Sequence, residues 1–345
     1  MNKDFVLERL EKLLSIPSPT GMTTEAIKYL KDEFDALGLE TRVTRKGALY
    51  ITLKGKSDEK STLIASHTDT LGAMVRSIEG DGNLLLVPIG GLPFTNVEAE
   101  NLIIHTRDGK KIEGTLMPKK SSVHVHGGEV LTTERKKENV RVRIDEDVNS
   151  KDDVKKLGIE VGDFITFDNR FRKTESGYIK SRFLDDKVCC IILLAALKEL
   201  VEEKVTPAYD VHFLISDYEE VGHGVYDLPE NLVEIISLDI GVVDPKQNTD
   251  EKSIILFAKD GRTPYDQNLL NEMITICKAN DIKYLIDVVD NYSSDATASL
   301  GQGRDVRFAC IGPGVESTHH YERTHLDAIE NSIKFVNHYV RAFGA

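Results

Sequence analysis

The chain has 345 residues, with 44 Lys and Arg against 57 Asp and Glu, so its formal net charge at pH 7 is −13. This acidity argues against nucleic acid or an anionic membrane surface as the main partner. The four cysteines form no CxxC pair, which argues against a disulfide framework or a thiolate zinc site and favours a reducing compartment.

The first 73 residues alternate between helical and strand patterns. Apolar residues at helical spacing predict helices over 5–14 and 24–37, and three strands are expected at 40–44, 48–53 and 61–66. The N-terminus lacks the apolar core of a signal peptide, and no run approaches the roughly 18 apolar residues of a membrane span. We therefore expect a cytoplasmic protein with no membrane partner.

Residues 74–165 have a different character. Short strand-like segments alternate there with Gly, Pro and charged turns, and no long helix pattern is present. The expected strands lie at 84–87, 101–105, 111–116 and 140–144. This pattern predicts a small β-rich domain inserted into an α/β domain, which residues 1–73 and 166–345 would form.

Helices and strands alternate again after the insert. We expect helices at 188–200, 268–279 and 326–343, and strands at 211–215, 232–238, 254–257, 282–289 and 306–311. The last strand is expected to end before Gly312-Pro313-Gly314. The predicted fold class is therefore α/β, with a mixed sheet flanked by helices and an inserted small β-rich domain.

Acidic residues and histidines follow the ends of several predicted strands. Glu219 and Glu220 come directly after a buried strand, where two neighbouring carboxylates repel each other unless a cation binds. The other candidates are His67 with Asp69, Asp239, His319 or His320, and Asp185 at a helix start. Open α/β sheets bind ligands at the carboxyl ends of their strands. Two histidines and three carboxylates there would suit two divalent ions that share one carboxylate.

Each of these residues also has a simpler interpretation. A single acid or histidine at a strand end is more often a cap or a surface group than a ligand, and Asp185-Asp186 can cap a helix. Asp239 can be a turn residue. The histidines of the insert are expected to be structural or exposed: His105, His124 and His126. Only the shared placement of the candidates favours a metal site.

The same segments resemble the family-42 metallo-aminopeptidases, the family of glutamyl aminopeptidase and the tetrahedral aminopeptidases. The matching segments, in order, are 16–21, 66–72, 184–187, 219–222, 238–239 and 319–322. They extend over nearly the whole chain, and that family carries an inserted domain at the same place. One departure is Lys187, which stands after Asp185-Asp186 where members often have Arg.

The resemblance implies a role for each candidate. The two ligand sets would be His67, Asp185 and Asp239 for one ion, and Asp185, Glu220 and His319 for the other, with Asp185 bridging. Glu219 would be the general base, and Asp69 would orient His67. His319 is preferred to His320 because of its spacing to Glu322.

The implied activity is that of a co-catalytic two-metal aminopeptidase acting on peptides. A water that bridges the ions would lose a proton to Glu219 and attack the scissile carbonyl. Two divalent ions per subunit are expected, zinc first, with cobalt and manganese as alternatives. Family members assemble into twelve-subunit hollow tetrahedra through the insert, so a homo-oligomer is expected here.

Two other functions remain open on the sequence. The same metal chemistry could serve an amidase or deacylase that acts on a small N-acylated or modified amino acid. A catalytically inactive structural homologue is the third possibility, although every proposed ligand and the base are present. The preferred N-terminal residue of a substrate does not follow from the sequence.

Overall fold

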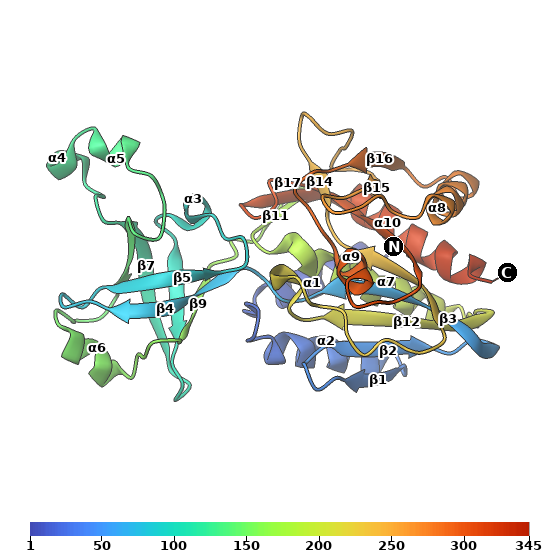
Figure 1. Cartoon of the computed structure of the whole chain (residues 1–345), viewed down its shortest axis with the longest axis horizontal. Coiled ribbons are helices and arrows are strands. Elements are labelled where there is room, and N and C mark those ends of the chain that lie inside the picture. Colours follow the sequence, from blue (N-terminus) through green and yellow to red (C-terminus); the bar gives the residue numbers. More distant parts are fainter. Residues whose placement is uncertain (345) are drawn as a thin grey trace. The chain divides into compact units, whose positions relative to one another are not determined.

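The computed structural model describes residues 1–344 and divides into two compact units (Figure 1). Unit 1 consists of residues 1–70 and 170–344, and unit 2 consists of Leu71–Asn169. The boundaries therefore lie at 70/71 and 169/170, against the expected 73/74 and 165/166. Among the described residues, no helix combines the length and the apolar character that a membrane crossing requires.

A 12-stranded mixed sheet forms the centre of unit 1 and confirms the predicted α/β class. Its main path runs in the order β1-β2-β12-β3-β13-β17-β18-β11-β10. Parallel pairing joins four central strands, β3 (Ser57–His67), β12 (Tyr209–Ser216), β13 (Leu232–Leu238) and β17 (Arg307–Glu316). Since these strands run the same way, their carboxyl ends meet at one edge of the sheet.

The remaining strands of unit 1 extend this parallel centre, mostly by antiparallel pairing. They are β1 (Glu40–Val43), β2 (Leu49–Leu53), β10 (Arg172–Lys173), β11 (Tyr178–Ser181), β14 (Gly241–Val243), β15 (Ile254–Lys259), β16 (Tyr284–Val288) and β18 (Glu322–His325). The β1–β2 hairpin pairs with β12 through β2, in antiparallel register. The tip of this hairpin therefore lies at the end of the sheet where β12 finishes.

The helices of unit 1 bury a large apolar core against the sheet. They are α1 (Lys3–Leu14), α2 (Thr24–Ala36), α7 (Leu184–Glu202), α8 (Gln267–Ala279), α9 (Asp295–Leu300) and α10 (Leu326–Ala342). Helix α7 is buried continuously from residue 184 to residue 197 and contacts α1, α10 and β3. A helix that is apolar on all sides is expected in such a position, because it has no face for water. Its first turn carries Asp185 and Asp186.

Unit 2 is a closed barrel in the order β4-β5-β8-β7-β6-β9. Its strands are β4 (Gly72–Ile78), β5 (Leu84–Ile89), β6 (Asn101–His105), β7 (Lys111–Pro118), β8 (Val140–Ile144) and β9 (Phe164–Phe167). Its short helices are α3 (Phe94–Val97), α4 (Val123–His126), α5 (Glu129–Thr132) and α6 (Lys151–Leu157). Closure of the barrel removes the open sheet edges that a small β domain would otherwise expose.

The last strand of the parallel centre differs from the expectation. β17 continues through Gly312-Pro313-Gly314 to Glu316, because beyond residue 311 it exchanges its partner β13 for β14 and β15. Gly312 is required there by close packing, since a Cβ atom at this position would lie 1.3 Å from the carbonyl oxygen of Asp239. The amide of Asp239 in turn donates to the carbonyl of Ile311 at 2.9 Å. The backbone at Asp239 is therefore fixed by β17.

Candidate metal centre

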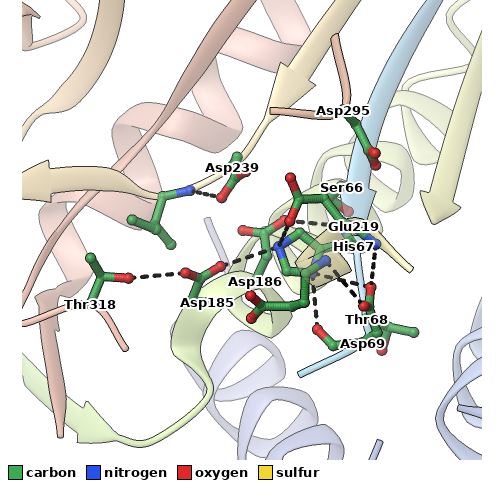
Figure 2. Close-up of polar contacts among 12 residues, drawn as sticks. Ser66, His67, Thr68, Asp69, Asp185, Asp186, Glu219, Asp239, Asp295 and Thr318 are labelled. Atoms are coloured by element: carbon green, nitrogen blue, oxygen red, sulfur yellow. Dashed lines mark hydrogen bonds and ion pairs between the residues drawn. The ribbon is translucent and has the colours of Figure 1, made fainter. Parts of the chain in front are cut away.

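The predicted acids and histidines of unit 1 lie together at the carboxyl ends of the parallel strands. Figure 2 shows His67, Asp185, Glu219 and Asp239 of this cluster. They come from the end of β3 (His67), the start of α7 (Asp185), the 3₁₀ turn Glu219–Val221 after β12 (Glu219 and Glu220), the residue after β13 (Asp239) and the β17–β18 loop (His319). Segments far apart in the sequence thus contribute to one cluster. The strand-end rule accounts for this convergence.

Asp185 lies between the two histidines of the cluster. Its Oδ1 is 3.2 Å from His67 Nε2, and its Oδ2 is 3.6 Å from His319 Nε2. Thr318 Oγ1 donates to the same Oδ2 at 3.0 Å, as Figure 2 shows. One carboxylate therefore presents a separate oxygen to each histidine, which is the placement that a bridging ligand needs. His320 belongs to neither ligand group found among residues 1–344.

Two groups of three side chains have potential ligand atoms within 4.8 Å of one another. They are Asp185, Glu220 and His319, and His67, Asp186 and Asp239. The sequence had assigned Asp186 only to helix capping. The adjacent pair Asp185-Asp186 before an apolar helix was the available signal, of the same kind as Glu219-Glu220. Both Asp185 and Asp186 have non-helical dihedral angles, and the peptide bond between them is cis.

Asp69 is completely buried and organises the segment that carries the two glutamates. Its Oδ1 accepts the backbone N–H of Glu219 at 3.1 Å, and its Oδ2 accepts that of Glu220 at 3.3 Å. Thr20 Oγ1 also donates to Oδ2 at 2.6 Å. On the other side, Asp69 Oδ1 is 3.5 Å and its carbonyl oxygen 2.9 Å from His67 Nδ1. Asp69 therefore orients His67 and holds both glutamates by their main chain.

The cluster carries more negative charge than its own histidines balance. Burial raises the pKa of Glu219, Glu220 and Asp186 well above the usual range of a carboxyl group. Burial and the neighbouring charge of Asp185 raise the pKa of Asp239 to about 7. Buried acids that repel one another in this way are stabilised in their ionised form by a cation. The donor set of imidazole and carboxylate groups suits a borderline divalent metal ion.

His67 and Asp185 form a charged pair within the cluster. Burial lowers the pKa of His67, but its hydrogen bonds to Asp185 and Asp69 outweigh burial and hold the pKa well above the usual value. Burial alone would raise the pKa of Asp185. The hydrogen bond and charge of His67 outweigh the effect of burial, so the pKa of this carboxyl group lies below its usual value. Asp185 is thus the carboxylate of the cluster that is most ready to act as an anionic ligand.

Two acids beside the cluster were missed as site residues in the sequence. Glu322, used there only as a spacing marker, accepts the backbone N–H of Asp185 at 3.1 Å and of His319 at 3.2 Å. Asp295 is buried, and its Oδ2 accepts Ser216 Oγ at 2.5 Å, while its Oδ1 has no hydrogen-bond partner among the described residues. No local motif marks either residue as part of the site, because Asp295 bonds to a residue 79 positions away and Glu322 reaches Asp185 across 137 positions.

Lys187 does not face the cluster. Its Nζ donates to the carbonyl oxygens of Leu13 at 3.2 Å and Ile16 at 2.6 Å. It is buried, and burial lowers its pKa to about 7. Its role is to anchor the start of α7 to the end of α1.

Comparisons with known proteins find similarity to aminopeptidases. A family model described as M42 glutamyl aminopeptidase matches residues 47–335. The chain is 38% identical over 337 residues to the protein YhfE of Bacillus subtilis (strain 168), which is named provisionally as an aminopeptidase; the match covers 97% of each chain.

Solved structures share the fold over the full length. The aminopeptidase APDkam598 from the archaeon Desulfurococcus kamchatkensis matches with a TM-score of 0.87 and 22% identity, over 99% of this chain and 95% of that chain. The TET1 peptidase of Pyrococcus horikoshii, described as able to assemble into a tetrahedron or a large octahedral shell, matches with a TM-score of 0.81 and 20% identity, over 98% and 99%. At these sequence identities, the structural similarity shows a shared fold and no more.

The raised pKa of Asp239 predicts how the metal-free protein responds to pH. Between about pH 4 and pH 7 the folded state binds a proton at Asp239 that the unfolded chain has released, so stability falls as pH rises through this window. A pKa shift of this size corresponds to about 4 kcal/mol in the free energy of unfolding. A bound divalent ion should remove most of the loss. Urea unfolding at pH 5 and pH 8, with chelator and with added zinc, measures both effects.

Asp239→Asn provides the control for this measurement, because it lacks the titrating group and should show a smaller loss between the two pH values. Equal stability of the chelated parent protein at pH 5 and pH 8 would contradict the interpretation.

Proposed function

This chain belongs to the M42 glutamyl aminopeptidase family and is a peptide hydrolase, and from that premise we propose that it removes N-terminal residues from peptides with two divalent metal ions and Glu219 as the general base. The family match confirms the resemblance drawn from the sequence motifs. One observation carries the two-metal proposal: Asp185 presents one oxygen to His67 and the other to His319.

The proposed ligands divide into two sets that share Asp185. They are His67, Asp185 and Asp239 for one ion, and Asp185, Glu220 and His319 for the other. Asp186 also lies close enough to His67 and Asp239 to be a ligand of the first ion. Its Oδ2, however, already accepts the backbone N–H of His67 at 3.1 Å. Asp185 instead faces Nε2 of His67, the ring atom that is available to a metal. This contrast favours Asp185 as the bridging ligand.

Glu219 is suited to move a proton in this reaction. Its Oε2 is 3.7 Å from His67 Nε2, and its backbone is held by Asp69. Divalent ions bound by the ligands would lower the pKa of a water and polarise the scissile carbonyl. Glu219 would take a proton from the attacking water and pass it to the leaving amine. Its burial, which raises its pKa, supports the second of these transfers.

The excess of carboxylates also supports an aminopeptidase over the amidase alternative. A peptide substrate brings a free α-ammonium group, which an acidic site attracts, whereas an N-acylated amino acid brings none. Negative charge around Glu219 comes from Asp69, Asp239 and Asp295, and Oδ1 of Asp295 has no hydrogen-bond partner among the described residues. Comparing hydrolysis of aminoacyl anilides with that of N-acylated amino acids distinguishes the two activities.

Glu219→Gln should abolish turnover, because the amide cannot accept the proton; a loss of about 10²- to 10⁴-fold in kcat is expected. The metal content of the variant should match that of the parent, since Glu219 is not a proposed ligand. Kinetics on aminoacyl anilides and elemental analysis of the same preparation give both values. Glu230→Gln, an exposed glutamate in the following loop, is the control. Near-parental activity of Glu219→Gln would exclude it as the base.

Asp185→Asn tests the bridging role. The amide keeps the shape of the side chain but removes its negative charge, so both ions should be lost, whereas Glu220→Gln should lose one. Elemental analysis after gel filtration, reported as ions per chain, separates these results. Asp186→Asn is the matched control, because it changes the neighbouring acid. A greater loss of metal from Asp186→Asn than from Asp185→Asn would assign the shared ligand to Asp186.

Unit 2 is proposed to mediate assembly into a homo-oligomer. Its α4–α5 segment exposes Val123, Val125 and Leu131, with 56%, 74% and 82% of their surface accessible. Neighbouring exposed apolar side chains of this kind mark surfaces that bind other proteins. The TET1 peptidase of Pyrococcus horikoshii, which shares the fold, can assemble into a tetrahedron or a large octahedral shell.

Multi-angle light scattering should therefore give a mass of several chains for the parent protein. Leu131→Glu should lower that mass, because it places a charge in the apolar segment, while Val161→Glu, at another exposed valine of unit 2, should not. A monomeric parent would refute the assembly, and an unchanged mass of Leu131→Glu would exclude this segment as the interface.

A further inference from the structure

Lys46 is outside every motif of the chain, yet it reaches the segment that follows the two glutamates. It lies between β1 and β2, in the tip of their hairpin. Its Nζ donates to the carbonyl oxygen of His223 and lies 3.0 Å from Nδ1 of the same residue. A single side chain thus joins the hairpin to the chain four residues beyond Glu219.

Aromatic rings enclose the ammonium group of Lys46. Its Nζ is 4.8 Å from the ring centroid of Tyr218 and 3.7 Å from that of Tyr226, so both rings make cation–π contacts. The His223 ring stacks on Tyr218 at 5.2 Å and meets Tyr226 edge-on at 6.2 Å. These four side chains, Lys46, Tyr218, His223 and Tyr226, are called the lysine clamp below.

The lysine clamp acts directly on the residue before Glu219. Tyr218 has φ of +75°, a left-handed conformation that costs energy for a residue with a large side chain. Its carbonyl oxygen accepts the backbone N–H of His223 at 3.1 Å, which closes the turn around Glu219 and Glu220. The contacts of the ammonium with the Tyr218 ring and with His223 hold both ends of this turn.

The hairpin tip also packs closely on the end of β12. A Cβ atom at Gly47, whose φ is +110°, would lie 3.1 Å from Asp217 Oδ2. Thr23 Oγ1 donates to the same oxygen at 2.8 Å. The negative charges that act on the Lys46 ammonium belong to Asp217, Asp295 and Asp69. Lys46 therefore also supplies positive charge beside an acidic region that its hairpin touches.

We propose that Lys46 is a positioning residue, which holds the turn 218–223 and through it places the Glu219 carboxylate for proton transfer. The proposal rests on the function proposed for Glu219. The side-chain contacts of Lys46 are with His223, Tyr218 and Tyr226 and not with Glu219 itself, so its loss should misplace the base without removing it. A small misplacement of a reacting group lowers turnover strongly while substrate binding and metal binding persist.

Lys46→Met is the central variant, because it keeps the apolar stem and removes the ammonium. It should lower kcat about 10- to 100-fold with KM changed less than about twofold, and its metal content should equal that of the parent. Lys46→Arg keeps a cation that can donate to His223 and stack on the tyrosines, so it should recover most of the lost kcat. Lys54→Met, which removes an exposed lysine paired with Asp210 just beyond β2, is the matched control.

Hydrogen exchange provides a measurement that does not depend on activity. The amides of Gly222 and His223 donate to the carbonyls of Glu219 and Tyr218 in this turn, and they should exchange faster in Lys46→Met than in the parent. Exchange in α7 should not change. Tyr226→Leu should produce part of the same effect, and the double variant with Lys46→Met should be no worse than Lys46→Met alone.

Unchanged exchange at residues 222–223 in Lys46→Met would overturn the proposal, whatever the activity. A loss of kcat that matches a loss of folded protein, or a failure of Lys46→Arg to restore kcat, would also overturn it. Failure of the proposed function has a different signature: Glu219→Gln would remain active, or the parent would not hydrolyse the anilides, while the exchange result would still stand.

Discussion

Repulsion among buried carboxylates is the constraint on which this structure depends. The parallel strands and α7 bring Asp185, Asp239, Glu219 and Glu220 to one edge of the sheet, where burial raises the pKa of most of them. Such a cluster persists only if a rigid scaffold holds it and positive charge compensates it. The buried helix α7 and the 12-stranded sheet provide the first condition. His67, His319 and a bound cation would provide the second.

Main-chain hydrogen bonds to two buried acids fix the geometry of the centre. Asp69 accepts the amides of Glu219 and Glu220, and Glu322 accepts those of Asp185 and His319. Each acid thereby joins residues from separate segments. Hydrogen bonds from backbone N–H groups to carboxylates are charge-assisted and stronger than neutral ones. The positions of the proposed ligands are consequently set by the protein itself, as the proposed pair of ions would require.

The sequence predicted the parts of the fold and site that depend on local pattern. Apolar runs located the central strands, and the carboxyl-end rule then identified His67, Asp239 and the glutamate pair as candidates. Partner exchange along β17 was not predictable, because Gly312-Pro313-Gly314 reads locally as a loop and becomes a strand only through β14 and β15. Lys46 and Asp295 were missed for a related reason. Their importance arises from the antiparallel placement of the β1–β2 hairpin and from contacts across the sheet, which leave no mark on nearby residues.

The departure of this chain from its family at Lys187 also has a physical explanation. Lys187 replaces the common Arg, but its ammonium is bound to carbonyl oxygens at and just beyond the end of α1, where the helix dipole favours a positive charge. A guanidinium could make the same contacts, so this substitution concerns the anchoring of α7 and does not alter the substrate side of the centre. Residues 221–226 differ from Lys187 in their position. Val221 and Tyr226 are exposed, and His223 is held between Tyr218 and Tyr226 beside the proposed base Glu219. Differences in substrate choice within this fold are therefore to be sought in residues 221–226, where a change of side chain alters both the surface beside Glu219 and the contacts that hold it.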